Sequence, residues 1–392
     1  MGAEEDWLKI IRKLNGDVVQ YRKICKCGKP EIGLLEQAYN DFDIDMNRLH
    51  MVGDRNDRGR SVYDMISLVT GGCGFIGSHM VDRLLTEGHT VRVIDNWTTG
   101  RPENLDHQKD NPNLTVYHMD IRNKEEIEPI FKDVDYIFHF AALADIVPSI
   151  QRPWDYYSSN VLGTYNVVEC AKDTGIKKLV YAASSSCYGI PDEYPTKESA
   201  EIRTQYPYAL TKRLGEETVL HWGQVYGLPV ITLRLFNVYG TRSRTSGTYG
   251  AVFGVFLAQK LAGKPFTVVG DGNQTRDFTY VTDIADAFYT AAMSDIVQDT
   301  FNVGSGGTYS VNRLCELLGG EITHIPKRPG EPDCTFADTS KIENKLGWKA
   351  KVSFEEGVQK VLDNIDYWRE APVWTPDSIG VATEDWFKYL GK

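Results

Sequence analysis

The sequence has no long apolar run and no excess of positive charge. Because no stretch of about 18 apolar residues occurs, a membrane-spanning helix is not expected. The 43 Lys and Arg against 54 Asp and Glu give a net charge of −11, which argues against general nucleic-acid binding but allows a small basic pocket for one phosphorylated ligand. The stretch MGAEEDWLKIIRK is too charged for a signal peptide. We expect a cytoplasmic protein with neither nucleic acid nor membrane as a partner.

Cysteine is also scarce. The seven cysteines are an odd number without regular spacing, so we expect reduced thiols and not a disulfide framework.

The overall composition is ordinary for a globular protein, with 42% hydrophobic and 25% charged residues. A chain of 392 residues has room for two or three domains.

Short apolar strands alternate with helices from Ser67 onward. This alternation implies right-handed crossovers, and therefore an α/β fold with a doubly wound parallel sheet of the Rossmann type. Strands are predicted at 67–70, 90–95, 134–142, 178–184 and 229–236, and helices at 75–88, 159–175 and 208–227.

Three parts are predicted along the chain. Residues 1–62 form a short N-terminal extension, and residues 63–240 form the doubly wound domain. After residue 240 the alternation loosens, and glycine, proline and aromatic residues become more frequent. Residues 241–392 are therefore predicted to be mainly a smaller mixed α/β substrate-binding cap, with strands that return to the main sheet.

A glycine-rich turn, TGGCGFIG, stands between the first strand and the first helix of this pattern. Its glycines permit a tight turn and let the backbone approach a pyrophosphate at the positive end of the helix. A close-packed turn with no ligand is the alternative. Asp95 ends the second strand, roughly 20 residues further on, where a carboxylate accepts both ribose hydroxyls of NAD and repels the extra phosphate of NADP.

No arginine directly follows Asp95, so NAD is the predicted cofactor, although Asp95 could instead only cap its turn. Asp120 and Ile121 follow the place where a third strand would end, which suits the adenine edge. The cofactor residues predicted in this first half of the sheet are Gly71, Gly74, Phe75, Ile76, Gly77, Asp95, Asn96, Asp120 and Ile121.

The stretch YPYALTKRLGEE places Tyr208 four residues before Lys212, so both project from one face of a helix. A lysine ammonium would lower the tyrosine's pKa and bond the nicotinamide ribose, which makes the tyrosine a usable base. This spacing alone is common on solvated helices. It gains weight from AASSSCYG, one βα unit earlier, where Ser184 ends a strand and would bond the substrate oxygen that loses or gains a proton.

Seven motifs together resemble the extended short-chain dehydrogenase/reductase family, and within it the nucleotide-sugar 4-epimerases of the UDP-glucose and UDP-N-acetylglucosamine type. They are TGGCGFIGSH, HFAA, SSSCYG, YALTK, LRLFNVYG, GDGNQTRDFTYVTD and RPGEPD, and the resemblance covers residues 67 to about 365. It implies NAD-dependent inversion at C4 of a UDP-sugar or related nucleotide sugar, in surface-polysaccharide or sugar-nucleotide metabolism. It also implies a homodimer built through the helix after SNVLGT and the helix that carries Tyr208.

The resemblance also assigns residues. Ser184, Tyr208 and Lys212 would be catalytic. Further NAD contacts would come from Ala141, Ala142, Asn160, Tyr208, Lys212 and Phe236. The substrate would be bound by Ser186, Asn237, Arg276, Arg328 and Thr335, with the arginines on the diphosphate and nucleoside. No metal site is predicted.

Related enzymes with other chemistry carry an extra proton-transfer group after the hydroxyl residue. Dehydratases have an Asp-Glu pair where this chain has Ser185 and Ser186, decarboxylases have Glu at Ser186, and 3,5-epimerases have Cys there. Cys187 follows the position at which 3,5-epimerases carry their cysteine by one residue. We therefore interpret it as a thiol packed in the core. Simple C4 inversion is therefore favoured over a dehydratase or decarboxylase. A non-catalytic NAD-binding sensor is the remaining class, and the intact Ser184, Tyr208 and Lys212 argue against it.

The identity of the sugar stays open at this point. By resemblance, Thr335 stands where a small residue admits a 2-acetamido group. Arg242 and Arg244 could meet a uronic acid's carboxylate, or could simply be solvated. A UDP-uronate and a nucleotide-heptose therefore remain alternatives to a UDP-hexose or UDP-N-acetylhexosamine.

Residues 16–60 resemble the C-terminal half of a haloacid-dehalogenase-type heptose-bisphosphate phosphatase. By that resemblance Lys29 would bind phosphate, Asp54 would help to hold Mg²⁺, and Cys25 and Cys27 would be half of a zinc site. The D-x-D nucleophile motif is missing from residues 1–24, and two cysteines cannot close a four-ligand zinc shell. No phosphatase activity is expected from this remnant, whose role stays open.

Overall fold

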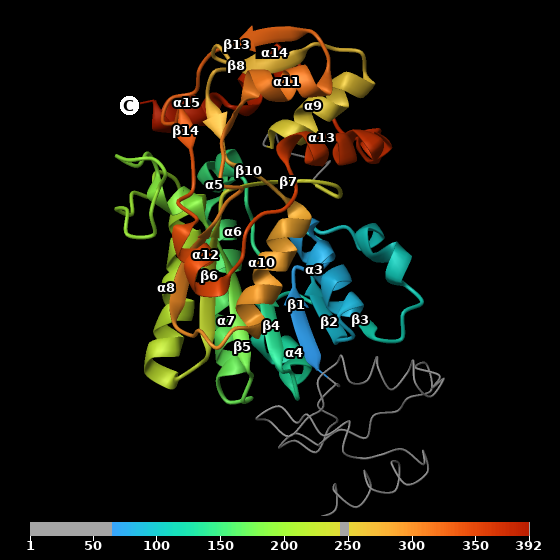
Figure 1. Cartoon of the computed structure of the whole chain (residues 1–392), viewed down its shortest axis with the longest axis vertical. Coiled ribbons are helices and arrows are strands. Elements are labelled where there is room, and N and C mark those ends of the chain that lie inside the picture. The colour runs from blue at the N-terminus through green and yellow to red at the C-terminus, as the bar shows by residue number, and fades with distance from the viewer. Residues whose placement is uncertain (1–64, 244–250, 392) are drawn as a thin grey trace, which may run out of the picture. The chain divides into compact units, whose positions relative to one another are not determined.

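The computed structural model describes residues 65–243 and 251–391 (Figure 1). These residues belong to a compact unit that begins at Met65. Outside the described residues lie Arg244 and the four residues of the phosphatase-like remnant, Cys25, Cys27, Lys29 and Asp54. The interpretation of residues 1–62 therefore stays a prediction.

Seven parallel strands form the central sheet, in the order β11-β6-β5-β4-β1-β2-β3. Their bounds are β1 Ile66–Thr70, β2 Thr90–Asp95, β3 Leu114–His118, β4 Tyr136–His139, β5 Lys178–Ser184, β6 Val230–Leu235 and β11 Asp299–Val303. The predicted doubly wound α/β fold is confirmed. Strands β2 and β5 have their predicted bounds, whereas β4 ends early because the chain leaves the sheet after His139 and lines a cavity.

Helices cover both faces of this sheet. The α-helices are α3 Phe75–Thr86, α4 Lys124–Ile127, α5 Ile146–Gln151, α6 Pro153–Tyr157, α7 Gly163–Lys172, α8 Pro207–Tyr226, α9 Val252–Leu261, α10 Val281–Met293, α11 Val311–Leu318, α12 Ser340–Leu346, α13 Phe354–Asp363, α14 Pro376–Ala382 and α15 Glu384–Leu390. The 3₁₀ helices are η2 Pro102–Gln108, η3 Glu128–Phe131, η5 Ser185–Tyr188 and η6 Ile365–Trp368, and η4 Ser158–Leu162 is a π turn.

Alternating strand residues explain the two covered faces, because successive side chains of a strand point to opposite sides. Val69 and Val93 pack in one fully buried cluster with residues of α3 and α10. Their neighbours Leu68 and Ile94 pack in a second cluster with residues of α7 and α8. Both faces of the sheet are therefore apolar, which is why its strands read as nearly continuous hydrophobic runs.

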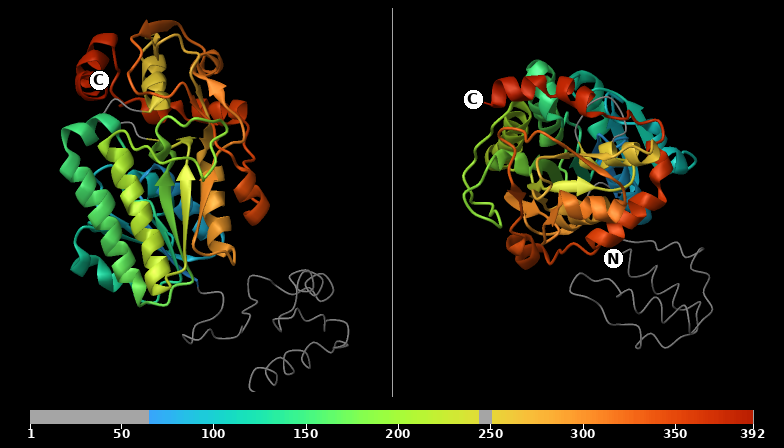
Figure 2. Two further views of the ribbon diagram at one scale, coloured as in Figure 1. Left: turned by 90° about the vertical axis from the view of Figure 1, so that its left-hand side faces the viewer. Right: turned by 90° about the horizontal axis from the view of Figure 1, so that it is seen from above.

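Helices α9, α11, α13, α14 and α15 and the remaining strands form a cap beyond the carboxyl ends of the central strands (Figures 1 and 2). Its short strands are β7 Asn237–Tyr239, β8 Phe266–Val269, β9 Thr275–Arg276, β10 Phe278–Tyr280, β12 Tyr309–Ser310, β13 Ile322–Ile325 and β14 Cys334–Thr335. They pair as β10-β7, β12-β9-β14 and β13-β8. Strand β11 lies in the central sheet although it follows the first cap strands in sequence. The domain boundary at residue 240 stays a prediction.

Candidate active site

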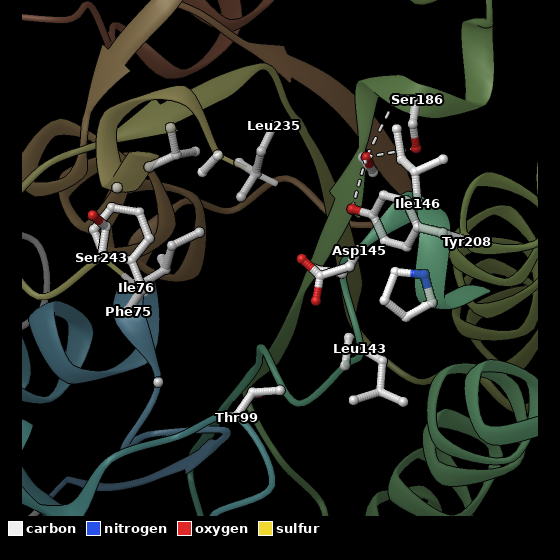
Figure 3. Close-up of a pocket in the computed structure, with 18 of the residues that line it drawn as sticks. Phe75, Ile76, Thr99, Leu143, Asp145, Ile146, Ser186, Tyr208, Leu235 and Ser243 are labelled. Carbon is white, nitrogen blue, oxygen red and sulfur yellow. Dashed lines mark hydrogen bonds between the residues drawn. The ribbon is translucent and has the colours of Figure 1, made fainter. Parts of the chain in front are cut away.

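A cavity of about 1040 Å³ lies where the central sheet meets the cap (Figure 3). The carboxyl ends of parallel strands are the usual place for a ligand in such folds. Twenty of the twenty-one predicted site residues line this cavity, and Asn160 is the exception. Residues that are distant in sequence are thus brought together as the motifs predicted.

The glycine turn at one end of the cavity has no room for side chains. Gly71 has a φ of 72°, and a Cβ on it would stand 2.7 Å from the backbone nitrogen of Ala141. A Cβ on Gly77 would stand 2.1 Å from the carbonyl oxygen of Gly71. Helix α3 begins directly after Gly74, so its positive end faces the cavity. The turn therefore has the shape that a dinucleotide's pyrophosphate requires, and the residues present fit NAD.

Asp95 was predicted either to bind the ribose of NAD or only to cap its turn. Its carboxylate accepts the backbone N–H groups of Cys73 at 3.0 Å and Trp97 at 2.8 Å, so it does cap the turn. Burial raises the pKa of Asp95, and these hydrogen bonds oppose that rise. Each carboxylate oxygen keeps a second lone pair. Asp95 also lines the cavity, so capping the turn and accepting ribose hydroxyls are compatible.

The ends of β2 and β3 are tied together beside Asp95. Asn96 donates its side-chain amide to Asp120 at 2.8 Å, and Arg122 donates to the same carboxylate at 2.7 Å. Burial opposes ionisation of Asp120, but the hydrogen bonds from Arg122 and Asn96 outweigh it and lower its pKa to about 2. The edge assigned to adenosine therefore carries an ionised carboxylate that is held by Asn96 and neutralised by its ion pair with Arg122.

The catalytic residues meet at the end of β5. The hydroxyl of Tyr208, on α8, donates to Oγ of Ser184 at 3.3 Å, and Oγ of Ser184 lies 2.8 Å from Oγ of Ser186 (Figure 3). Lys212 is one helical turn after Tyr208 and is buried, with its ammonium 4.3 Å from the ring centre of Tyr181. Burial lowers the pKa of Lys212 to about 7, and Glu216 partly opposes this.

The expected lowering of the tyrosine's pKa by Lys212 is not what the protein's own groups produce. Burial raises the pKa of Tyr208, the hydrogen bond with Ser184 lowers it, and the charge of Asp145 raises it further. The net direction for these groups is upward because burial penalises the phenolate, and it also penalises the ammonium of Lys212. The effect of Lys212 on the tyrosine stays a prediction.

Asn160 positions the cavity wall instead of lining it. It is fully buried in the π turn η4, where its side-chain oxygen accepts the N–H of Leu143 at 2.8 Å and its amide donates to the carbonyl of Leu143 at 3.0 Å. It also donates to Thr211 at 3.1 Å. Asn160 is not among the residues that line the cavity, and its side chain holds the loop that carries Ala141 and Ala142. Its assignment to the NAD site stays a prediction.

The two predicted substrate arginines share a carboxylate that the sequence reading did not single out. Glu331 accepts from Arg276 at 2.9 Å and pairs with Arg328 at 3.3 Å. All three side chains line the cavity. A carboxylate between two guanidinium groups holds both in place and reduces their mutual repulsion. The sequence signal was the position of Glu331 inside the RPGEPD motif.

Arg242 lines the cavity and is paired with a carboxylate of α3. Its guanidinium pairs with Asp82 on α3 at 2.7 Å, and Asp82 also lies 2.6 Å from His107. Pairing with a carboxylate does not decide whether Arg242 meets a uronate, because Arg276 and Arg328 are paired with Glu331 in the same way. The choice between a uronic acid and a neutral sugar therefore stays open, and Arg244 lies outside the described residues.

The C-terminal helix adds a cavity residue that no family motif predicts. Trp386, on α15, is buried, donates its indole N–H to the carbonyl of Pro329 at 2.7 Å, and has the guanidinium of Arg328 5.2 Å from its ring centre. Helix α15 also packs against α5, where Gln151 donates to Asp385 at 2.9 Å. Trp386 of α15 therefore packs against Arg328, one of the predicted phosphate-binding arginines.

Residues 67–304 match the model of the NAD dependent epimerase/dehydratase family. Among curated relatives, a putative UDP-glucose 4-epimerase of Methanocaldococcus jannaschii is 38% identical over 76% of this chain and 97% of its own length. UDP-glucuronic acid decarboxylase 1 of Arabidopsis thaliana is 35% identical over 76% of this chain and 69% of that protein.

Two solved structures extend the likeness to the whole fold. UDP-glucose 4-epimerase of Thermotoga maritima, with UDP-glucose, matches with a TM-score of 0.72 and 34% identity over 78% of this chain and 99% of that one. UDP-glucuronic acid 4-epimerase of Bacillus cereus, in complex with UDP-glucuronic acid and NAD, matches with a TM-score of 0.72 and 29% identity over 77% and 99%.

The chain belongs to the NAD dependent epimerase/dehydratase family. The predicted resemblance, the NAD cofactor and the enzyme class, an NAD-dependent nucleotide-sugar epimerase, are confirmed. Within residues 65–243 and 251–391, no helix has the length and apolar character needed to cross a membrane. Cytoplasmic location stays an expectation.

Proposed function

We propose that the protein inverts C4 of a UDP-hexose or UDP-N-acetylhexosamine through a 4-keto intermediate. The observation that carries this proposal is the cluster of Tyr208, Ser184 and Lys212, with serine hydroxyls at the two positions that directly follow Ser184. Ser185 and Ser186 stand where dehydratases and decarboxylases carry acidic side chains. Serine is no acid or base near neutral pH, so Ser185 and Ser186 do not supply the extra proton transfer that a dehydratase or a decarboxylase requires.

In the proposed reaction Tyr208 takes the proton of the C4 hydroxyl and later returns it to the C4 oxygen. Ser184 bonds the same oxygen and holds it within reach of the tyrosine. NAD, when bound, supplies the acceptor and donor of the C4 hydride. The positive charge of bound NAD⁺ would favour the phenolate of Tyr208, against the effect of burial. Lys212 would hold the cofactor by donating a hydrogen bond to the nicotinamide ribose.

Cys187 supports the same choice of chemistry. It is 1% exposed, and burial raises the pKa of its thiol to about 12. A buried thiol with that pKa is a poor acid–base group at neutral pH. The reading of Cys187 as a packed thiol therefore favours C4 inversion over 3,5-epimerisation.

The other end of the cavity suits a sugar nucleotide. Arg276 and Arg328 are the groups proposed to bind the diphosphate, because a guanidinium fork donates two hydrogen bonds to phosphate oxygens. Thr335 lies near them and leaves more room than a tyrosine would, which favours acceptance of a 2-acetamido sugar. We place the reaction in surface-polysaccharide or sugar-nucleotide metabolism.

A homodimer is part of the proposal. Helices α7 and α8 pack side by side, and Tyr165 of α7 contacts Trp222 of α8 with ring centres 5.5 Å apart. Large apolar side chains are exposed along these helices and the π turn before α7, namely Leu162, Tyr165, Leu210, Val225 and Tyr226. Such a patch on a soluble protein is typical of an interface, and a second copy pairing its own α7 and α8 here would form a four-helix bundle.

The proposal is tested by proton NMR of the purified protein with UDP-galactose and UDP-N-acetylgalactosamine in separate samples, first without and then with added NAD. The expected result is the gluco-configured C4 epimer. A Tyr208→Phe variant is expected to keep NAD and to lose turnover by about 10²-fold or more. Tyr157→Phe, at an exposed tyrosine outside the cavity, is the control. No epimer from either sugar with NAD present would refute the UDP-sugar proposal.

A further inference from the structure

A glycine in the interior of the catalytic helix α8 has a structural reason. Gly215 belongs to the stretch YPYALTKRLGEE, where glycine is unfavourable because it has more backbone freedom to lose than alanine. A Cβ on Gly215 would stand 2.4 Å from the hydroxyl oxygen of Tyr181, which lies on β5 against the helix. The missing side chain therefore makes room for a fully buried tyrosine directly beneath the helix that carries the catalytic residues.

Tyr181 contacts the catalytic lysine in two ways. Its hydroxyl donates to the backbone carbonyl of Lys212 at 3.4 Å, and the ammonium of Lys212 lies 4.3 Å from the centre of its ring. The negative face of an aromatic ring attracts a cation, and the attraction is stronger where water is excluded. Both side chains are buried, so the ring stabilises the ammonium in a place where burial alone penalises it.

The ionisable groups that share α8 with Lys212 do not supply this contact. Glu216, one turn further on, forms ion pairs with Arg213 and Arg234, each at 2.8 Å. Tyr208, one turn earlier, has its pKa raised by burial above the ordinary value, so its phenol carries no negative charge in the cofactor-free protein. Among the residues that the structure describes, no carboxylate forms an ion pair with Lys212.

His139 of β4 completes the surroundings of Tyr181. The two ring centres are 5.3 Å apart, and the imidazole nitrogens lie 2.6 Å from the hydroxyl of Thr70 and 2.9 Å from that of Thr164. Burial, and to a smaller extent the charge of Lys212, lowers the pKa of His139 to about 3, so its ring is neutral at physiological pH. The ammonium therefore faces uncharged aromatic groups on this side.

We propose that Tyr181 is a positioning residue whose ring face holds the ammonium of Lys212 and whose hydroxyl fixes the turn of α8 that carries this lysine. Tyr181 is not among the residues that line the cavity, so it acts through Lys212. The inference rests on the proposed function, in which Lys212 bonds the nicotinamide ribose, and it names the residue that keeps Lys212 in place.

The inference is tested by titrating Lys212 in the full-length protein, without added NAD, by ¹³C NMR of lysine labelled at Cε. Lys212→Met assigns the resonance, because the signal is missing in that variant. Tyr181→Phe keeps the ring and is expected to keep the titration midpoint. A trifluorinated phenylalanine at the same position keeps the shape of the ring but weakens its negative face. It is expected to lower the midpoint by about half a pH unit or more, because the ammonium loses the attraction that favours it.

Phe138→Leu is the matched control for loss of a buried ring. Phe138 is also fully buried in the central sheet, but it packs on the opposite face, so the variant is expected to lose stability and to keep the midpoint of Lys212. Gly215→Ala is a second test, because its Cβ overlaps the hydroxyl of Tyr181. It is expected to weaken NADH binding about threefold or more, measured by fluorescence, and Tyr181→Phe in the same chain is expected to restore the affinity.

Each remaining outcome decides the matter. A midpoint that stays the same or rises with the fluorinated ring would overturn the role of Tyr181, because loss of the attraction lowers it. An equal fall in Phe138→Leu would also overturn that role, since general loosening would then explain the shift. The titration needs no turnover. The expected midpoints without any epimer would therefore overturn the proposed reaction and support Tyr181 as the residue that positions Lys212.

Discussion

The hydroxyl of Thr335 donates to the side-chain oxygen of Asn237 at 2.6 Å, which links strand β14 of the cap to strand β7. The same hydroxyl accepts the backbone N–H of Asp277 at 3.3 Å. Both partners hold Thr335 in one orientation at the cavity wall. The two predicted substrate residues are therefore a single hydrogen-bonded unit, and the small side chain of Thr335 limits how far that wall projects into the cavity.

Replacing Thr335 by tyrosine is expected to reduce kcat/KM for UDP-N-acetylgalactosamine by about tenfold or more and to change that for UDP-galactose much less. The larger ring would occupy the space that a 2-acetamido group needs. Thr335→Val removes the hydroxyl bonded to Asn237 but keeps the size of the side chain, and it is the control for loss of that hydrogen bond. Equal losses for both sugars in Thr335→Tyr would show that the residue does not control access at C2.

Lys212 is expected to make the stability of the cofactor-free protein depend on pH. Its pKa is about 7 in the folded protein and about 10.4 when unfolded. Below pH 7 the lysine is charged in both states and the full burial penalty applies. Between the two values the unfolded state binds more protons, so the stability contributed by this residue rises with pH.

Lys212→Met is therefore expected to raise the free energy of unfolding at pH 6.5, by an amount on the order of 3 kcal/mol, and by less at pH 9.5. Urea unfolding of wild type and variant at both pH values measures the difference. The exposed Lys264→Met is the control and is expected to show no such trend. The same gain at both pH values would mean that Lys212 stays charged in the folded protein throughout this range.

Trp386 is expected to support substrate binding through Arg328. Removing the ring in Trp386→Ala takes away the surface against which the guanidinium packs and the hydrogen bond to Pro329, so KM for the nucleotide sugar is expected to rise about three- to tenfold. The affinity for NAD is expected to stay the same. Phe387→Ala changes the neighbouring, exposed aromatic residue and serves as the control. An unchanged KM in Trp386→Ala would limit α15 to a structural role.

Leu210 is exposed on α8, and Leu210→Glu places a charge on the proposed dimer surface. The variant is expected to elute as a monomer in size-exclusion chromatography with light scattering, whereas the wild type elutes as a dimer. Lys264→Glu, on an exposed residue between α9 and β8, is the control for the added negative charge. A dimeric Leu210→Glu variant or a monomeric wild type would contradict the proposed interface.

The sequence alone determined the features that depend on neighbours along the chain. The glycine turn is readable because only residues without a Cβ fit between a strand and a helix at that approach, as Gly77 demonstrates. The pairing of Tyr208 with Lys212 can be predicted because a helical turn places residues four apart on one face. The place of Ser184 can be predicted because parallel strands end at a common edge, so the end of β5 reaches the site.

Only the tertiary structure decided the features that depend on partners far apart in sequence. It showed that Asn160 holds Leu143 instead of lining the cavity, and that Glu331 lies between Arg276 and Arg328. It also brought Trp386 to the cavity wall, beyond the last family motif. Hydrogen-bond partners and burial are set by three-dimensional packing, and that packing also determines whether a buried tyrosine's pKa rises or falls.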